Sequence, residues 1–312
     1  MNHSDASVCP ICRQTGMETI MSGLFDDRFG APGFYDIVRC RHCGMEQTWP
    51  RPTESELKEL YEQYYNWGGE QGTIYTRVRE WLLLSPLYRL WLRVDGDLSF
   101  HLRRGAGRLL DIGCNEGRGL VLYAQNGFQA EGLELNENAA AVARAKGFRV
   151  YTGALERLAP AEPFDVVVLS NVIEHLPDPV AALQTVHRLL RPGGQVWISC
   201  PNGNSLWRRV FGRRWINYHV PFHLWHFSPD TLREILTRAD FRIVEIQTLT
   251  PALWLADSLC GIFGDRQGRP NKVMRSAPVI AGLMLASRCL LALLRQVNRQ
   301  MKGDCLIVVA EA

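Results

Sequence analysis

The chain of 312 residues is long enough for one large α/β domain with an appended module, or for two domains. Hydrophobic residues make up 46% and charged residues 21% of it, as in an ordinary globular protein with a sizeable core. The net charge of +3 is too small for a nucleic-acid-binding balance, so no nucleic acid is expected as a partner. Because the first ten residues lack the apolar run of a secretion signal, a cytoplasmic location is expected.

Two CxxC pairs, Cys9/Cys12 and Cys40/Cys43, lie within residues 1–52. Each pair places two thiolates on a tight turn, and two such turns on facing hairpins complete a tetrahedral four-sulfur site, which predicts a zinc ribbon. A metal with four protein ligands is structural rather than catalytic. Two redox dithiols are disfavoured because no strand–helix context accompanies either pair, and iron in a rubredoxin-like site is a further alternative. His42 is expected at the surface.

Residues 53–104 read as a helical lead-in that covers the active site. Thr53-Glu54-Ser55-Glu56 is a capping box that opens a helix. A glycine-rich loop follows at 67–72, and an aromatic, arginine-rich helical stretch interrupted by Pro86 runs from 74 to 104.

Strands and helices alternate through residues 105–312, starting with the apolar run Leu109, Leu110 and Ile112. Further strands are predicted at 128–135, 148–153, 164–170, 195–202, 242–250 and 305–312, and helices at 136–147, 178–194 and 228–241. Continuous apolar strands in a βαβ order indicate an α/β fold with a doubly wound parallel sheet that is buried on both faces.

The turn after the first strand, in RLLDIGCNEGRG, has the glycines of a nucleotide-binding turn. A dinucleotide fingerprint needs a glycine where Asn115 stands, since the backbone has to approach a pyrophosphate there. S-adenosylmethionine has no phosphate. Asp111 is placed to accept hydrogen bonds from its ammonium group, and Glu134, at the end of the second strand, to accept both ribose hydroxyls.

The motifs LLDIGCNEG, GLELN, FDVVVLSNVIEHLPDP and LLRPGGQVWISCPN together resemble those of class I S-adenosylmethionine-dependent methyltransferases, from about residue 108 to 312. The resemblance implies a Rossmann-like, mostly parallel seven-stranded sheet whose last strand is antiparallel. The stretch 9–65 resembles a lead-in found in bacterial methyltransferases of sugar and glycan pathways, where a segment matching Tyr64 and Tyr65 covers the active site.

The resemblance also implies a set of cofactor-binding residues: Asp111, Gly113, Asn115, Gly117, Glu134, Leu135, Ala154, Leu155, Ser170 and Asn171. Asn115 replaces the usual middle glycine, which asparagine tolerates because it adopts positive φ more readily than most residues. Ala154 stands where the family often has an aspartate that contacts adenine. Adenine recognition is therefore expected from backbone groups near Ala154 and Leu155, or from Glu156.

The acceptor site is expected in two long segments on the same edge of the sheet, 201–227 and 251–304. His223 resembles the histidine of a Glu-His pair in deoxysugar C-methyltransferases, but Phe222 replaces the glutamate. Glu174 and His175 resemble a pair near the acceptor in ubiquinone-pathway O-methyltransferases. Either group supplies a candidate base. A packing role and a zinc site for the three histidines between 219 and 226 are the alternatives.

The apolar segment 277–294 is expected to be a buried lid helix, or alternatively an interfacial helix that meets a lipid-linked acceptor at the inner membrane. It is not expected to span the membrane, because the last strand must return to the same sheet and Arg288 lies near its middle.

The sequence therefore predicts an S-adenosylmethionine-dependent methyltransferase with structural zinc. We expect it to methylate an oxygen, or secondarily a carbon, of a small-molecule acceptor such as a sugar or glycan precursor. One alternative acceptor is a quinone or another lipophilic phenol. A methyltransferase fold kept only for binding is the alternative without catalysis.

Overall fold

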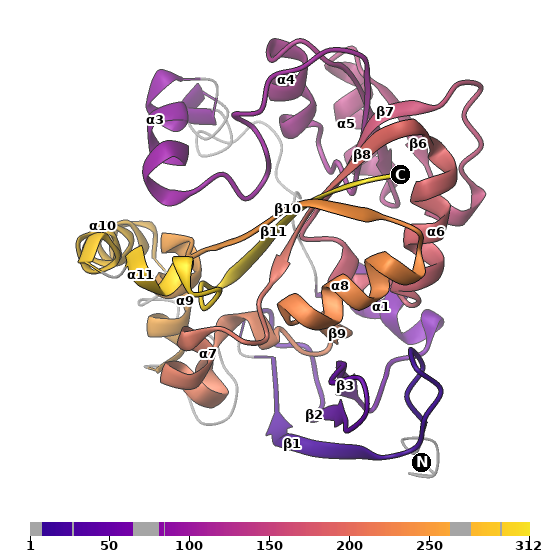
Figure 1. Cartoon of the computed structure of the whole chain (residues 1–312). Helices are drawn as coiled ribbons and strands as arrows, with labels where there is room; N and C mark the ends of the chain where they lie inside the picture. The colour runs from indigo at the N-terminus through magenta and orange to yellow at the C-terminus, as the bar shows by residue number, and fades with distance from the viewer. Residues whose placement is uncertain (1–7, 27, 65–80, 84, 263–275, 294) are drawn as a thin grey trace.

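The chain folds around two β-sheets in the computed structural model, which describes residues 8–26, 28–64, 81–83, 85–262, 276–293 and 295–312 (Figure 1). The larger sheet has seven strands in the order β10-β11-β8-β7-β4-β5-β6. These are β4 (Arg108–Ile112), β5 (Gln129–Glu134), β6 (Arg149–Thr152), β7 (Phe164–Ser170), β8 (Leu190–Pro201), β10 (Arg242–Leu249) and β11 (Cys305–Glu311). Strands β8, β7, β4, β5 and β6 are parallel, and β11 is antiparallel to both of its neighbours. The predicted Rossmann-like sheet is confirmed.

Helices cover both faces of this sheet. Helices α6 (Pro179–Leu189) and α8 (Pro229–Arg238) cover one face, and α4 (Arg118–Gln125) and α5 (Glu137–Ala145) cover the other. Successive strand residues point to opposite faces, so Leu110 and Val167 pack with α6 and α8 while Leu109 and Val168 pack with α4 and α5. Burial on both sides explains why these strands are apolar throughout.

The predicted C-terminal boundary of the helix at 178–194 is wrong. Helix α6 ends at Leu189, and strand β8 begins at the next residue. Leu190 pairs with Phe164 of β7, and the amide of Gly193 donates to the carbonyl of Ala312 (3.0 Å). Residues 190–194, which the Pro-Gly-Gly pattern had assigned to the helix, therefore belong to strand β8.

The smaller sheet has the order β1-β2-β3-β9 and contains strands from two distant parts of the chain. It consists of β1 (Met17–Leu24), β2 (Tyr35–Cys40), β3 (Glu46–Trp49) and β9 (Trp225–His226). Strand β9 follows β8 of the larger sheet and pairs antiparallel with β3. The predicted N-terminal ribbon thus shares its sheet with the segment 201–227.

The remaining helices connect or cover the two sheets. They are α1 (Glu54–Gln63), α3 (Pro86–Asp95), α7 (Leu206–Phe211), α9 (Ala252–Ile262), α10 (Ala277–Leu293), α11 (Arg295–Arg299) and the short 3-10 helices η2 (Leu155–Arg157), η3 (Ile173–His175), η4 (Gly212–Arg214) and η5 (Ile216–Tyr218). Helix α1 starts with the predicted capping box, in which Thr53 and Glu56 cap each other.

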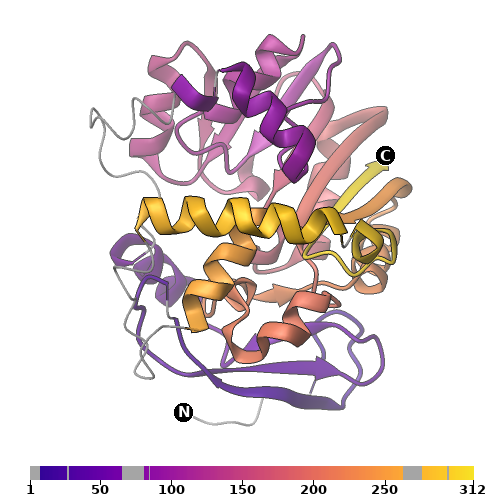
Figure 2. The same ribbon diagram turned by 90° about the vertical axis from the view of Figure 1, so that its left-hand side faces the viewer.

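The expectation that segment 277–294 is a buried lid is wrong. Helix α9 is the buried helix of this region, whereas α10 lies across the outside of the molecule (Figure 2). Among residues 277–289 of α10, only Ser287 is buried, and Leu285 is 63% exposed. In the described part of the chain, no helix combines the length and the apolar character needed to cross a membrane.

Candidate active site and zinc site

The carboxyl ends of the adjacent strands β7, β4 and β5 bring Ser170, Asp111 and Glu134 to one edge of the sheet. Asp111 is buried, and its pKa is raised to about 7 by burial and, secondly, by the charge of Glu134. Glu134 accepts hydrogen bonds from the amides of Asn115 (2.8 Å) and Asn136 (2.9 Å), one on each oxygen. Since each oxygen has two acceptor positions, two further donors can still bind this carboxylate.

The turn between β4 and α4 is shaped by positive φ angles and by close packing. Gly113, Asn115 and Gly117 have φ of 74°, 49° and 74°. A Cβ at Gly117 would lie 2.7 Å from the Cβ of Ala143, so α5 can approach only a glycine. Gly119 was not singled out in the sequence, yet a Cβ there would come within 3.1 Å of Asp111 Oδ2. The lack of a side chain at Gly119 therefore lets α4 pack closely against Asp111.

The other cofactor candidates line the same edge with different exposure. Leu135 is 75% exposed directly after β5, which suits an apolar side chain that a ligand covers. Ala154 is half-buried at the start of η2, Leu155 is buried, and Glu156 is exposed. The residues present thus fit a nucleoside between β5 and η2.

The end of β7 bears two candidate contacts. The hydroxyl of Ser170 lies 3.2 Å from that of Ser99 and donates to the carbonyl of Leu98 (3.3 Å), so the lead-in passes directly over it. Asn171 has a φ of 55°, and its buried amide oxygen has no hydrogen-bond partner among the described residues. A strained backbone with an unsatisfied polar group is a common mark of a functional position.

Glu174, His175 and His223 come together next to this edge. Glu174 and His175 lie in η3, four and five residues after β7, and His223 comes from the segment after β8. Their side-chain ligand atoms lie within 4.8 Å of one another, and His223 Nε2 is 3.9 Å from Glu174 Oε1. The two candidate bases of the sequence are therefore parts of one cluster, and Glu174 supplies the carboxylate that Phe222 lacks.

Hydrogen bonds to the backbone orient both imidazoles. His223 Nδ1 donates to the carbonyl of Asn217 (2.8 Å), and His175 Nδ1 donates to that of Phe222 (3.0 Å). Because a carbonyl can only accept, the proton of each neutral ring sits on Nδ1, and Nε2 carries the lone pair. His223 can therefore accept a proton at Nε2.

Burial dominates the electrostatics of the cluster. It raises the pKa of Glu174 to about 8, and both oxygens of this carboxyl lack hydrogen-bond partners among the described residues. It lowers the pKa of His175 to about 4 and that of His223 well below the ordinary value, with smaller contributions from neighbouring charges. The histidines are thus neutral at physiological pH.

Tyr61 belongs to this site although the sequence did not single it out. Its hydroxyl lies 2.8 Å from His175 Nδ1, and its ring packs against Phe222 at 5.4 Å between centroids. The residues expected to cover the active site were Tyr64 and Tyr65. Tyr64 is the residue that follows α1, and Tyr65 lies outside the described residues. The helical spacing from Tyr64 back to Tyr61 was the available signal.

The three histidines of the segment 219–226 do not form one group. His226 lies in β9, where its Nε2 is 3.1 Å from the hydroxyl of Thr48. His219 lies on the other side, with Nδ1 3.3 Å from His223 Nε2. The fold therefore does not bring these three side chains together as ligands of one zinc ion.

The four cysteines of the N-terminal ribbon do form one group. All four sulfur atoms lie within 4.8 Å of one another, and the Cys9–Cys43 and Cys12–Cys40 pairs are each 3.6 Å apart. A tetrahedral site with zinc–sulfur bonds of about 2.3 Å has sulfur–sulfur edges of about 3.8 Å. The cluster fits zinc, and His42 is exposed as predicted.

Comparisons with known proteins agree with the fold. The family model of a methyltransferase domain matches residues 88–246, half of the chain. A ubiquinone biosynthesis O-methyltransferase of Pseudomonas aeruginosa is 38% identical over 131 residues, which cover 39% of this chain and 53% of that protein. The chain thus spans about half the length of the curated relatives it matches.

A solved structure shows the same fold. The cyclase SpnF has a TM-score of 0.50 and 18% identity over 84% of this chain and 97% of its own. A SAM-dependent methyltransferase from Archaeoglobus fulgidus has a TM-score of 0.45 and 23% identity, over 77% of this chain and 100% of its own. With half of its length matched to the family model, the chain belongs to the methyltransferase-domain family.

Proposed function

We propose that the protein methylates a hydroxyl oxygen of a small-molecule acceptor and that His223 takes the hydroxyl proton. The observation that carries this proposal is the position of one cluster. Glu174 and His175 lie three and four residues beyond Asn171 on the loop after β7, and His223, from the segment after β8, lies against them. A base there lies where a methyl group and an acceptor oxygen would meet.

When bound, S-adenosylmethionine supplies an electrophilic methyl group. The chain's own residues orient the acceptor and move its proton. Neutral His223 accepts that proton at Nε2, and its Nδ1 keeps the hydrogen bond to the carbonyl of Asn217. Glu174 lies 3.9 Å away, and because its pKa is about 8, its carboxylate would stabilise the imidazolium chiefly near and above pH 8. Burial of the cluster excludes water from the transfer.

The acceptor proposed here is a phenol-type or sugar hydroxyl. The names of the curated relatives, ubiquinone biosynthesis O-methyltransferases, support the phenol-type acceptor. The resemblance of segment 9–65 to sugar-pathway enzymes supports the sugar. Oxygen is preferred to carbon because the curated relatives are named O-methyltransferases. A fold kept only for binding is the less supported alternative, since the chain belongs to the methyltransferase-domain family.

Helix α10 is proposed to place the enzyme on a membrane surface. Its outward face is apolar, with Ala281, Leu285 and Ala286 all exposed. On its inner side, Arg288 lies 3.2 Å from Asp95 of α3 and donates to the carbonyl of Thr250. An apolar face held parallel to the molecular surface suits contact with a bilayer that carries a lipophilic acceptor.

Turnover of phenols and of nucleotide sugars, read as S-adenosylhomocysteine formed, tests the proposed base. We expect His223→Ala to lower kcat by about 10²–10⁴-fold and to leave cofactor affinity unchanged. His187→Ala is the matched control, because His187 lies on α6, outside the cluster, and packs against Phe241. Normal kcat in His223→Ala, corrected for folded fraction, together with a large loss in His175→Ala, would show that the base is not His223.

A further inference from the structure

A buried carboxyl group that the proposed function does not use lies at the start of β11. Asp304 directly precedes this strand and is fully buried. Because β11 runs antiparallel to β8, its first residues lie at the edge where the parallel strands end, and Cys305 pairs with Pro201, the last residue of β8. Asp304 therefore lies at the edge of the sheet that carries the candidate active site.

Three side chains donate hydrogen bonds to this carboxyl group. The hydroxyl of Ser205 (2.7 Å) and the indole of Trp215 (2.7 Å) donate to Oδ1, and the side-chain amide of Asn217 (3.3 Å) donates to Oδ2. Burial raises the pKa of Asp304 to about 6, although the hydrogen bonds from Ser205 and Trp215 oppose this rise. Above pH 6 the group is therefore a carboxylate that accepts all three bonds.

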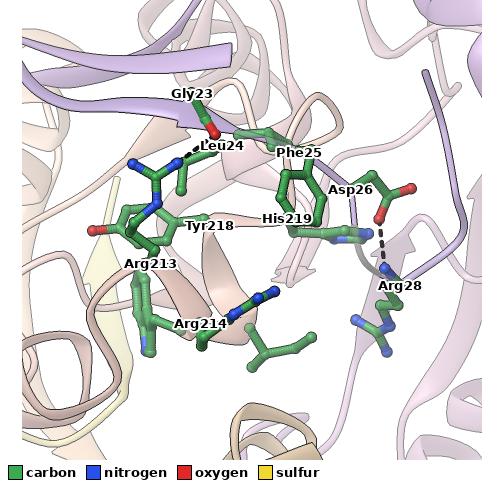
Figure 3. Close-up of a pocket in the computed structure, with 12 residues that line it drawn as sticks. Gly23, Leu24, Phe25, Asp26, Arg28, Arg213, Arg214, Tyr218 and His219 are labelled. Carbon is green, nitrogen blue, oxygen red and sulfur yellow. Dashed lines mark hydrogen bonds between the residues drawn. The ribbon is translucent and has the colours of Figure 1, made fainter. Parts of the chain in front are cut away.

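The three donors lie on segment 205–217, whose later part also contacts the smaller sheet. Figure 3 shows Arg213 of this segment donating to the carbonyl of Gly23 in β1, at 2.6 Å. A cavity of about 160 Å³ remains between this part of the segment and the turn after β1. Because packing against the smaller sheet is incomplete here, the hydrogen bonds to Asp304 are needed to fix the segment.

Asn217 connects Asp304 to the proposed base. Its side chain donates to the carboxylate, and its backbone carbonyl accepts a hydrogen bond from His223 Nδ1 (2.8 Å). Since a carbonyl can only accept, this bond keeps the proton of the neutral His223 ring on Nδ1 and leaves the lone pair on Nε2. The position of the Asn217 carbonyl therefore decides whether His223 can accept a proton at Nε2.

We propose that Asp304 is a positioning residue for methyl transfer, which fixes the orientation and the tautomer of His223 through Asn217. This inference rests on the proposed function and names the group that orients its base. A histidine whose neutral ring carries its proton on the wrong nitrogen cannot act as the base, even when the rest of the site is intact. Loss of the Asp304 carboxylate should therefore lower kcat and leave cofactor binding unchanged.

The two oxygens of Asp304 allow one of its hydrogen bonds to be broken selectively. In Asp304→Asn, an amide oxygen in the place of Oδ1 keeps the bonds from Ser205 and Trp215. The introduced NH2 group then faces that of Asn217, and two donors cannot bond to each other. We expect kcat at pH 8, read as S-adenosylhomocysteine formed, to fall by about 10- to 100-fold, with unchanged affinity for S-adenosylmethionine.

A reversed hydrogen bond provides the rescue, and Ser205→Ala is the matched control. The double variant Asp304→Asn/Asn217→Asp exchanges donor and acceptor, and we expect it to recover most of the kcat lost in Asp304→Asn. Ser205→Ala removes a bond to the other oxygen of the same carboxylate. It is expected to lower the free energy of unfolding and to leave the kcat of the folded enzyme unchanged. Equal kcat in folded Asp304→Asn and Ser205→Ala would show a structural role alone and overturns the inference.

Nitrogen-15 NMR of the His223 ring tests the positioning without turnover. The signals of His223 are identified by their absence in His223→Gln, and we expect Nδ1 to carry the proton in the wild type and in Ser205→Ala. In Asp304→Asn we expect a mixture of the two tautomers. Asn217→Ala removes the same bond from the other side and serves as the second variant if Asp304→Asn does not fold. A ring signal like that of the wild type in these variants overturns the inference.

The two readouts separate this inference from the proposed function. A changed tautomer in Asp304→Asn, combined with normal kcat in His223→Ala, supports the positioning of the ring and counts against the proposed function alone. A large loss of kcat in His223→Ala, with kcat and tautomer unchanged in Asp304→Asn, overturns the inference and leaves the proposed function standing.

Discussion

Asp111 is buried at the end of β4, and its pKa of about 7 makes cofactor binding depend on pH. In its proposed role the ionised carboxylate binds the ammonium group of S-adenosylmethionine. Because the pKa is raised, the ligand-free protein carries a proton on Asp111 below pH 7 and must release it on binding. We expect cofactor affinity to be constant above pH 7 and to fall by up to about 10-fold per pH unit below it.

Calorimetry at pH 6, 7 and 8 measures this dependence directly. Buffers of different ionisation enthalpy report the proton released at pH 6. Asp111→Asn is expected to bind more weakly at pH 8 and to lose the pH dependence. An affinity in the wild type that does not change between pH 6 and 8 would contradict the assigned role of Asp111.

Residues that the sequence identified are those next to a strand end. Asp111, Glu134 and Glu174 follow apolar runs, and parallel strands bring their carboxyl ends to one edge. Tyr61 could not be found in this way, because its position one helical turn before Tyr64 shows only a shared helix face. Tyr61 is 114 positions from His175 in sequence, and only the packing of α1 against η3 places it there. No local pattern encodes such a contact.

Helix α10 is the element whose position the sequence predicted least well. Its length and apolar composition indicated a helix, which is confirmed, but apolar composition alone cannot distinguish a buried helix from an interfacial one. The ion pair of Arg288 with Asp95 decides which face turns inward. Strand β9 was not predicted either, because two residues are too few to show a period.

Vesicle flotation tests the role proposed for α10. We expect the wild type to float with vesicles of phosphatidylcholine and phosphatidylglycerol, and Leu285→Glu to bind them about 10- to 100-fold more weakly, since burial of a leucine contributes about 1.5–3 kcal/mol. Val244→Glu places the same charge at an exposed apolar residue of β10 and serves as the control. Equal flotation of the two variants, or no flotation of the wild type, would contradict the membrane role.

At the scale of the whole molecule, the four-cysteine ribbon and the candidate active site share a sheet. Strand β9 pairs with β3, and the hydroxyl of Thr48 in β3 donates to the carbonyl of His223 (2.6 Å). The ribbon therefore contacts the backbone of the proposed base, His223. The cofactor edge, in contrast, belongs to the seven-stranded sheet. Loss of the metal should accordingly affect turnover more than cofactor binding.

We expect one equivalent of zinc per chain, held by Cys9, Cys12, Cys40 and Cys43. The double variant Cys40→Ser/Cys43→Ser is expected to lose this zinc and most of its turnover while it keeps its affinity for S-adenosylmethionine. Metal analysis and calorimetry of the same preparations check both statements. Zinc retained in the double variant would contradict the cysteine assignment and would direct attention to Glu174, His175 and His223.

The pairing of β3 with β9 also determines the order in which a growing chain can acquire its structure. Thr48 and His226, which meet in this sheet, are 178 positions apart. Ribosomes add about 5–20 residues per second, so the first three strands wait about 10–35 s for their fourth. During this interval the edge of β3 has no partner from its own chain. Early metal capture by the cysteines would protect the nascent segment, and the supply of zinc during translation would then set the yield of active enzyme.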